Sequence, residues 1–281
     1  MKNVFRRKAY TAYFDLGESP AAPPTVTLYH EWGDQIGGTL TSTLDSGTIY
    51  KVNLTSSHTE SSGVLKLKWS YSVGATAKSQ NSFLNIYSQY IDSLTFFDRH
   101  PETEDAWGDR FDELELKTRN IINTYCGQEF DIKISKTITL DGSDSKTLFL
   151  PLRIDSVAAV DAVVPTVSGT STDDITSLIE IHPESRFFLR AIDSQKFSKN
   201  AQFKIRGDWG WPYVPQNVTE AADYIILDLM NDDAAYRQHG VTNVRIDTHE
   251  MSFTDSIFGS TGNIDADVLL MDYTLYFLTM I

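Results

Sequence analysis

The sequence predicts a chain of two domains, an all-β sandwich followed by an α+β domain with a helical core and a β-hairpin insertion. Its 281 residues fit two domains of about 100–200 residues each. Apolar residues before residue 93 recur with the period of two that is typical of strands, whereas those that follow residue 108 recur with the period of about 3.6 that is typical of a helix. The charge also changes, because residues 1–76 carry seven Lys and Arg against six acidic residues and the remainder carries 17 against 32.

Residues 1–92 are predicted to form the β-sandwich. The clearest strand spans residues 63–71, where Leu65, Leu67 and Trp69 alternate with polar residues and so share one face. Further strands are expected at residues 8–16, 25–32, 48–54 and 82–87. Turn-forming Gly, Pro, Asp and Ser residues separate these runs, and short strands at this spacing are typical of antiparallel sandwiches.

Residues 93–108 are predicted to link the two domains. The stretch is largely polar, contains Pro101 and shows no apolar period. The second domain therefore spans residues 109–281.

Two amphipathic helices are predicted in this second domain. The first begins near Asp109, and Gly127 stands where a left-handed C-cap would end it. The second is predicted to begin at Asn217 as its N-cap, with Glu220 completing a capping box. A last segment, residues 264–281, carries apolar residues on nearly every side, which indicates that a partner or a core buries it.

Strands are predicted between the two helices. Residues 131–140 and 147–150 are expected to pair as a hairpin across a turn at residues 141–145. Further strands are expected at residues 154–164, 178–181, 186–191 and 201–207. The polar stretch 163–177 is interpreted as a loop insertion. An aromatic loop, formed by Trp209, Trp211 and Tyr213 with two prolines, leads into the second helix.

No set of residues points to catalysis, a metal or a cofactor. Cys126 is the single cysteine and has no Cys-His context, and no two of the six histidines have helical ligand spacing. Asp141 and Asp144 flank a glycine but lack the later ligands of a calcium loop, so a plain turn is the better interpretation. Phosphate-binding and dinucleotide-binding glycine patterns are absent from the sequence. The chain is therefore predicted not to be an enzyme, with no catalytic, metal or cofactor-binding residue.

Signals for membrane targeting are also missing from the sequence. A signal peptide has an apolar run after its basic start, and no such run follows the basic residues at the start of this chain. The longest apolar stretch, residues 268–281, is too short for a bilayer core of about 30 Å. Synthesis in the cytoplasm of a bacterial host is expected, with no membrane partner.

The order of motifs in residues 109–281 resembles the head-to-tail connector (adaptor) proteins of tailed bacteriophages. The resemblance rests on the helix end at residues 125–130, the strand–turn–strand at 139–157 that contains Leu150-Pro151, and the aromatic run 207–215 that opens a long helix. It covers roughly 170 of the 281 residues. The chain departs from the family pattern in its N-terminal β domain and in the stretch 163–177.

The resemblance implies a structural protein of the virion neck. Connectors of this kind form a ring, commonly of about twelve copies, below the portal protein, where they extend the DNA channel and dock the tail or tail-fibre proteins. DNA would pass without sequence-specific binding, and the acidic second domain agrees with weak attraction for phosphate. The expected assembly and portal interface consists of Ile264, Val268, Leu269, Tyr273, Tyr276, Phe277 and Ile281.

The N-terminal β domain resembles the immunoglobulin-like modules found on many virion proteins. Docking to another tail or neck protein is the expected use of such a module. The alternative hypothesis is a carbohydrate-binding or adhesion module of a virion or cell surface. In that hypothesis Tyr29, Trp32, Tyr50 and Trp69 would stack on sugars if they were exposed, whereas the simpler interpretation places most of them in the sandwich core.

Overall fold

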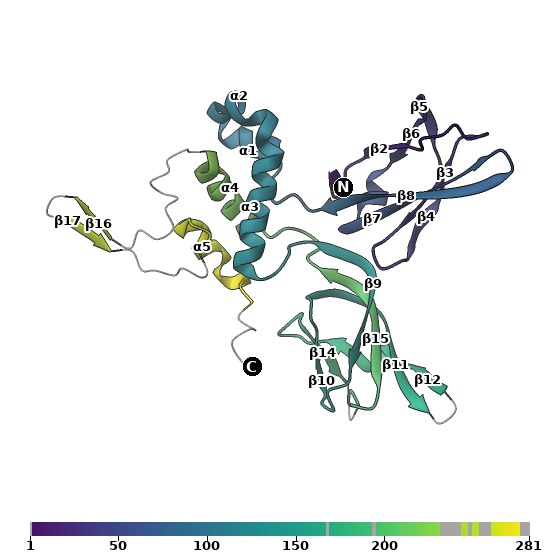
Figure 1. Cartoon of the computed structure of the whole chain (residues 1–281). Coiled ribbons are helices and arrows are strands. Elements are labelled where there is room, and N and C mark those ends of the chain that lie inside the picture. The colour runs from purple at the N-terminus through teal and green to yellow at the C-terminus, as the bar shows by residue number, and fades with distance from the viewer. Residues whose placement is uncertain are drawn as a thin grey trace. The chain divides into compact units, whose positions relative to one another are not determined.

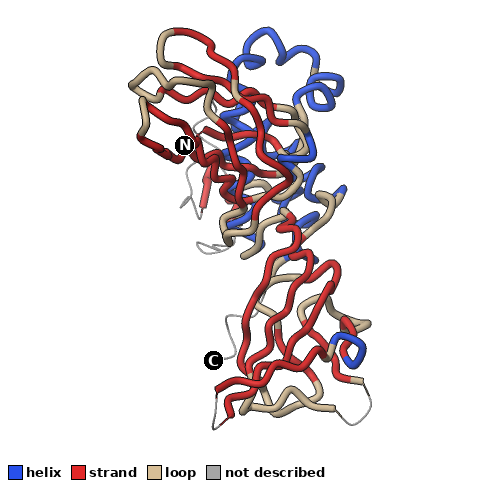
Figure 2. The backbone as a smooth tube through the Cα atoms, turned by 90° about the vertical axis from the view of Figure 1, so that its right-hand side faces the viewer, coloured by secondary structure: helices blue, strands red, loops and turns tan. Residues whose placement is uncertain are grey.

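The computed structural model describes residues 2–166, 169–192, 195–230, 243–246, 249–252 and 260–275, and it is rich in β-strands with a smaller set of helices. The chain divides into two compact units (Figure 1). Met1–Ser88 and Asp131–Tyr213 form the first, called here the β unit, and Gln89–Phe130 and Val214–Ile281 form the second, called the helical unit. Strands dominate the β unit, as the colouring of Figure 2 shows.

The first part of the β unit is a sandwich of two sheets. Its strands are β1 (Lys2–Phe5), β2 (Tyr10–Asp15), β3 (Thr25–Tyr29), β4 (Gln35–Thr41), β5 (Thr43–Ser46), β6 (Ile49–Leu54), β7 (Gly63–Val73) and β8 (Thr76–Tyr87), with a 3-10 turn η1 (Ser56–Thr59). One sheet has the order β1-β8-β7-β3-β4 and the other β2-β6-β5. All pairs are antiparallel except β1 with β8. The two sheets share one core, in which Phe14 of β2 stacks on Trp69 of β7 at 5.5 Å.

The alternation predicted for residues 63–71 is confirmed. Leu65, Leu67, Trp69 and Tyr71 are all buried on one face of β7, and the Trp69 indole N–H donates to the Ser82 hydroxyl on β8. This bond satisfies the one polar atom of a fully buried side chain, which would otherwise destabilise the core.

The second part of the β unit has its own core. Its strands are β9 (Ile132–Asp141), β10 (Thr147–Phe149), β11 (Ile154–Thr166), β12 (Gly169–Asp174), β13 (Ile179–Ile181), β14 (Phe188–Ala191) and β15 (Gln202–Gly210), with a 3-10 turn η4 (Thr176–Leu178). They form a sheet of order β12-β11-β15-β9 and a smaller one of order β10-β14-β13. Phe197, Phe203 and Trp209 lie in the core between them.

Two sequence predictions in this part are wrong. Residues 131–140 do not pair with residues 147–150, because β9 pairs with β15 and β10 with β14. The intervening turn instead bonds to a distant loop, with the Asp144 N–H donating to the Phe197 carbonyl oxygen. The stretch 163–177, expected to be a loop, contains β12, which pairs with the end of β11.

The predicted domain boundaries also differ from the observed division. Residues 131–213 belong to the same compact unit as the sandwich. The Ser62 N–H and hydroxyl both donate to the Ile132 carbonyl oxygen, at 2.8 and 2.7 Å, and the Lys133 ammonium lies 2.9 Å from the Glu31 carboxylate. These long-range bonds join segments that the sequence pattern treats separately.

The helical unit contains the remaining elements. They are α1 (Ser93–Arg99), η2 (Pro101–Thr103), α2 (Glu104–Trp107), η3 (Gly108–Arg110), α3 (Phe111–Cys126), α4 (Gln216–Met230), β16 (Asn243–Ile246), β17 (His249–Ser252), α5 (Ile264–Leu270) and η5 (Met271–Tyr273). Residues 93–108, predicted to be a linker, are therefore mainly helical. Asp92 caps α1 by accepting from the Thr95 N–H, and Phe96 and Phe97 pack on Phe111 at 5.2 and 5.3 Å.

Both predicted amphipathic helices are present. Helix α3 ends at Gly127 in the left-handed conformation, as the sequence predicts. Helix α4 begins one residue before the predicted cap, at Gln216, so Asn217 lies inside the helix. The backbone N–H groups of Val218 and Thr219 donate to the Pro215 carbonyl oxygen at the start of the helix.

Candidate assembly surface

Helix α5 is a short helix that is fixed by its first turn. The Asn263 side chain caps it by accepting from the Ala266 N–H at 2.9 Å, and its amide donates to the Asp228 carboxylate of α4 at 2.6 Å. Ala266 and Leu270, four residues apart, are fully buried where α5 packs on α4. One face of α5 is thereby committed to the core of its own unit.

The segment that precedes α5 is held by Asp267. Its carboxylate accepts from the Thr261 N–H at 2.8 Å, from the Thr261 hydroxyl at 2.7 Å and from the Ser260 hydroxyl at 2.6 Å. Hydrogen bonds to a carboxylate are stronger than those between neutral groups, and here three of them converge on one side chain. They fix the direction in which the chain enters the helix.

The opposite face of α5 is an exposed apolar surface. Ile264, Val268 and Met271 are 76%, 67% and 56% exposed. Ile264 and Val268 belong to α5, Met271 is the first residue of η5, and their spacing of four and three residues puts them on one side. They are called here the α5 stripe. Burying an Ile, Val or Met side chain contributes about 1.5–3 kcal/mol each, so a partner that covered the stripe would gain most of that.

The other residues expected at the assembly interface have mixed positions. Leu269 and Tyr273 are partly buried within the helical unit. The Tyr273 ring packs edge-on against Phe130 at 5.6 Å, and its carbonyl oxygen accepts from the Gln128 amide. The final three, Tyr276, Phe277 and Ile281, lie outside the described residues. Met271, which the sequence prediction omitted, is the residue that completes the stripe.

The net negative charge of the chain comes from the helical unit. This unit has 21 acidic residues against six Lys and Arg, whereas the β unit has 17 against 18. Exposed Asp265 and Asp272 lie beside the α5 stripe in the sequence. A partner for this surface therefore needs an apolar centre and a neutral or basic rim.

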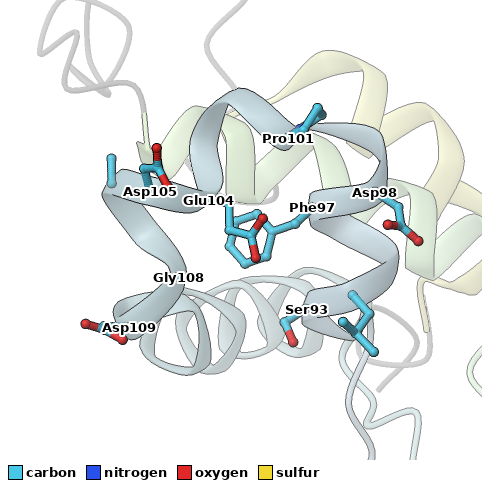
Figure 3. Close-up of a pocket in the computed structure, with 10 residues that line it drawn as sticks. Ser93, Phe97, Asp98, Pro101, Glu104, Asp105, Gly108 and Asp109 are labelled. Carbon is cyan, nitrogen blue, oxygen red and sulfur yellow. The ribbon is translucent and has the colours of Figure 1, made fainter.

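An open hollow of about 650 Å³ lies over α1 and α2 in the same unit. Four carboxylates line it, those of Asp98, Glu104, Asp105 and Asp109, and none of the residues that line it is basic. Figure 3 shows Phe97 and Glu104 among the side chains that line the hollow. The hollow adds to the acidic surface of the unit.

The predicted aromatic loop is divided between a strand and its exit. Trp209 belongs to β15 and is buried, with its indole N–H donating to the Lys136 carbonyl oxygen at 2.8 Å. Trp211 lies under the Arg153 guanidinium, 4.2 Å from the ring centroid. Tyr213 is 70% exposed. The Arg7 guanidinium lies 5.4 Å from the Tyr213 ring centroid, so all three aromatics contact other residues of the β unit.

The aromatics of the alternative sugar-binding hypothesis do not form an open platform. Trp69 and Tyr50 are in the sandwich core. The Trp32 ring stacks on His30 at 4.4 Å and lies 5.9 Å from the Lys136 ammonium. The Lys66 ammonium lies 5.4 Å from the Tyr29 ring centroid. Each of these rings is thus engaged by a neighbour of its own chain.

Reactive groups are few in the part of the chain that the structure describes. There, His, Cys, Asp and Glu side chains do not gather in threes around a point where a metal ion could bind. Burial, with a contribution from the charge of Asp267, raises the pKa of the Cys126 thiol to about 12. The thiol is therefore neutral at physiological pH and a poor nucleophile. None of the described helices has the length and apolarity to cross a membrane.

Comparisons with known proteins give little further guidance. No family model and no curated protein matches the sequence. Among solved structures, one match is a "putative glycoside hydrolase" from Bacteroides vulgatus, with 12% identity and a TM-score of 0.23. The match covers 32% of this chain and 17% of the other. A likeness at this level carries no argument about fold or function.

Proposed function

We propose that this chain is a structural protein of the bacteriophage neck, which forms a ring of about twelve copies below the portal protein, extends the DNA channel and docks the tail. The observation that carries the proposal is the α5 stripe, an apolar face on a short, well-capped helix of a strongly acidic unit. It is joined by the order of motifs in residues 109–281, which resembles the connector family.

The α5 stripe fits an assembly protein because its exposure is held in place. The cap at Asn263 and the bonds to Asp267 fix the helix, so the stripe cannot turn inward without breaking them. An exposed apolar cluster on a rigid helix is typical of a surface that another protein covers. In a ring, each copy would present this face to the next copy or to the portal in the same way.

The charge of the helical unit fits a channel for DNA. A wall with 21 acidic residues against six basic ones repels phosphate. DNA would pass such a wall without sequence-specific binding and without being retained. The carboxylates that line the hollow on α1 and α2 add to this effect.

The β unit is proposed to carry the docking role of the protein. Its first part, residues 1–92 in the sequence prediction, is proposed to be an immunoglobulin-like domain attached to a connector domain. Its two packed sheets, antiparallel apart from the pair β1 and β8, support that proposal. Docking to tail or tail-fibre proteins is its proposed use. No catalytic role is proposed for either unit, and the protein is placed in the virion neck after synthesis in the bacterial cytoplasm.

The copy number in purified particles tests the proposal. Quantitative mass spectrometry should give about twelve copies of this protein in each virion, in a fixed ratio to the portal protein. Absence from the particle would overturn the proposal. So would a copy number in multiples of three with location at the fibre tips, the result that an adhesion module would give.

A further inference from the structure

The two outer edges of the five-stranded sheet differ. At one edge, the pairing of β4 with β3 is irregular, because Val26 pairs with Leu40 whereas Leu28 pairs with Ile36. Residues 37–39 of β4 therefore lie opposite one residue of β3, and Gly37 among them is in the left-handed conformation at φ +60°. Bulged edges of this kind resist the addition of another strand. This edge is therefore protected.

The other edge is regular and open. Strand β1 covers β8 only from Leu84 to Tyr87. Residues 76–82 of β8 pair without a register shift with β7 on one side, and on the other side no strand pairs with them in the described part of the chain. This segment is called here the β8 edge. It contains no proline or glycine, and its one charged residue is Lys78.

The side chains on the inner face of the β8 edge already have hydrogen-bond or ion-pair partners within the sandwich. Lys78 lies 2.6 Å from the Glu18 carboxylate, the Gln80 amide donates to the Tyr71 hydroxyl, and the Ser82 hydroxyl accepts from Trp69. Ala77, Ser79 and Asn81 alternate with them on the outer face and are exposed. The backbone N–H and C=O groups of residues 76–82 that point away from β7 are thus available without any rearrangement of the sandwich.

An open, regular edge accepts an extended segment through backbone hydrogen bonds. Natural proteins usually block such edges with charges, prolines or bulges, as β4 does here. Lys78 does not block the β8 edge, because its charge is paired with Glu18. The contrast between the two edges of one sheet indicates that the β8 edge is used.

We propose that the β8 edge binds residues 276–281 of a second copy of this chain as an added strand. This proposal rests on the ring of the proposed function. The sequence of residues 276–281 is Tyr-Phe-Leu-Thr-Met-Ile, which contains no charge, glycine or proline and is rich in residues favoured in strands. These six residues would cover all but one of the seven residues of the β8 edge.

The point where this segment begins supports exchange between copies. The last described residue, Leu275, donates its N–H to the Cys126 carbonyl oxygen at the end of α3 and so belongs to the helical unit. The β8 edge belongs to the β unit. An added strand would tie the helical unit of one copy to the β unit of the next. Each copy would give one strand and receive one, as a closed ring requires.

Disulfide trapping tests this proposal on the full chain. In a Cys126→Ala background, Ala77→Cys, Ser79→Cys and Asn81→Cys are each mixed with a separate Thr279→Cys protein and oxidised. Three positions are used because they share the outer face, and a Leu278→Cys protein replaces the Thr279→Cys protein in a second set, because successive residues of a strand point to opposite faces and one of the two must face outward. Thr39→Cys, exposed on the protected β4 edge, is the matched control.

A heterodimer with at least one β8 variant, and at least ten times less with Thr39→Cys, is the expected result. Equal trapping with Thr39→Cys, or none with any β8 variant, would overturn the proposal. A second measurement uses the double variant Ser79→Cys/Thr279→Cys. Its crosslink within a single chain, in place of one between chains, would overturn the second-copy assignment.

The trapping result and the proposed function can fail separately. If the protein is absent from the virion but the heterodimer forms, strand exchange stands and the neck function fails. If about twelve copies are found in the neck but no heterodimer forms, the ring stands and is held by other contacts.

Discussion

The β unit and the helical unit use apolar side chains in different ways. The β unit is close to neutral, and its exposed large apolar residues, such as Tyr13, Phe83 and Phe149, come from separate strands. The helical unit is strongly acidic and exposes three apolar residues on one side of α5 and the first residue of η5. Single exposed apolar residues need no explanation, whereas exposed apolar residues that lie together are candidates for an interaction site. The comparison separates a unit whose exposed apolar residues are spread over its strands from one in which three of them lie together.

The largest expected effect is on the core of the β unit. Trp69→Ala removes a fully buried ring that contacts Phe14 and Ser82. A loss of about 3–5 kcal/mol in the free energy of unfolding is expected, measured by urea denaturation. Phe83→Ala, on an exposed residue of the same sheet, should change it by less than about 0.5 kcal/mol. Similar losses in both variants would mean that the core has been placed wrongly.

The next effect concerns the anchoring of α5. Asn263→Ala removes the helix cap and the bond to Asp228, with an expected cost of about 0.5–2 kcal/mol. Hydrogen exchange of α5 should then be faster. Asp265→Asn, an exposed change on the same helix, is the control. Unchanged exchange in Asn263→Ala would show that the stripe is not held by this cap.

The α5 stripe should matter to assembly and hardly to folding. Val268→Asp is expected to change the free energy of unfolding by less than about 0.5 kcal/mol, because the side chain is exposed. Incorporation into particles should fall at least tenfold in a complementation assay. Leu94→Asp adds the same charge to an exposed apolar site on α1 and should assemble normally. Loss of assembly in both variants would assign the effect to charge and not to the stripe.

The smallest effect concerns Cys126. Burial raises its pKa from 9.0 to about 12, so folding favours the neutral thiol. This contribution to stability is present below the unfolded-state pKa and is lost as pH rises from about 9 toward 12. Alkylation at pH 8 should be slow in the native protein and fast in urea. Rapid native alkylation would place the thiol at the surface.

Local patterns in the sequence predicted individual elements well. The alternation around Leu67 predicted β7, and Gly127 predicted the end of α3. Both elements depend on residues close to one another in the chain. The helix at residues 93–99 was missed because its two adjacent apolar residues, Phe96 and Phe97, form no repeating period. The pairing of β9 with β15 and of β10 with β14 was also missed. Such pairing depends on residues far apart in sequence, where the pattern of one strand contains no record of its neighbour.

The candidate surface was predicted only in part. The segment from Ile264 was expected to be apolar on nearly every side, and the sequence could not distinguish the side that packs on α4 from the side that stays exposed. The structure makes that distinction, with Ala266 and Leu270 inside and Ile264, Val268 and Met271 outside. The spacing from Ile264 through Val268 to Met271 was the available signal for the third residue. The β8 edge had no signal, because it depends on where β1 ends on β8.

A cryo-EM reconstruction of the particle neck tests the central claim most directly, that the α5 stripe is an assembly surface. The expected map shows about twelve copies of this chain below the portal, with Ile264, Val268 and Met271 covered by a neighbouring copy or by the portal. A neck that lacks the protein, or a ring in which the α5 stripe faces solvent in every copy, would contradict the claim.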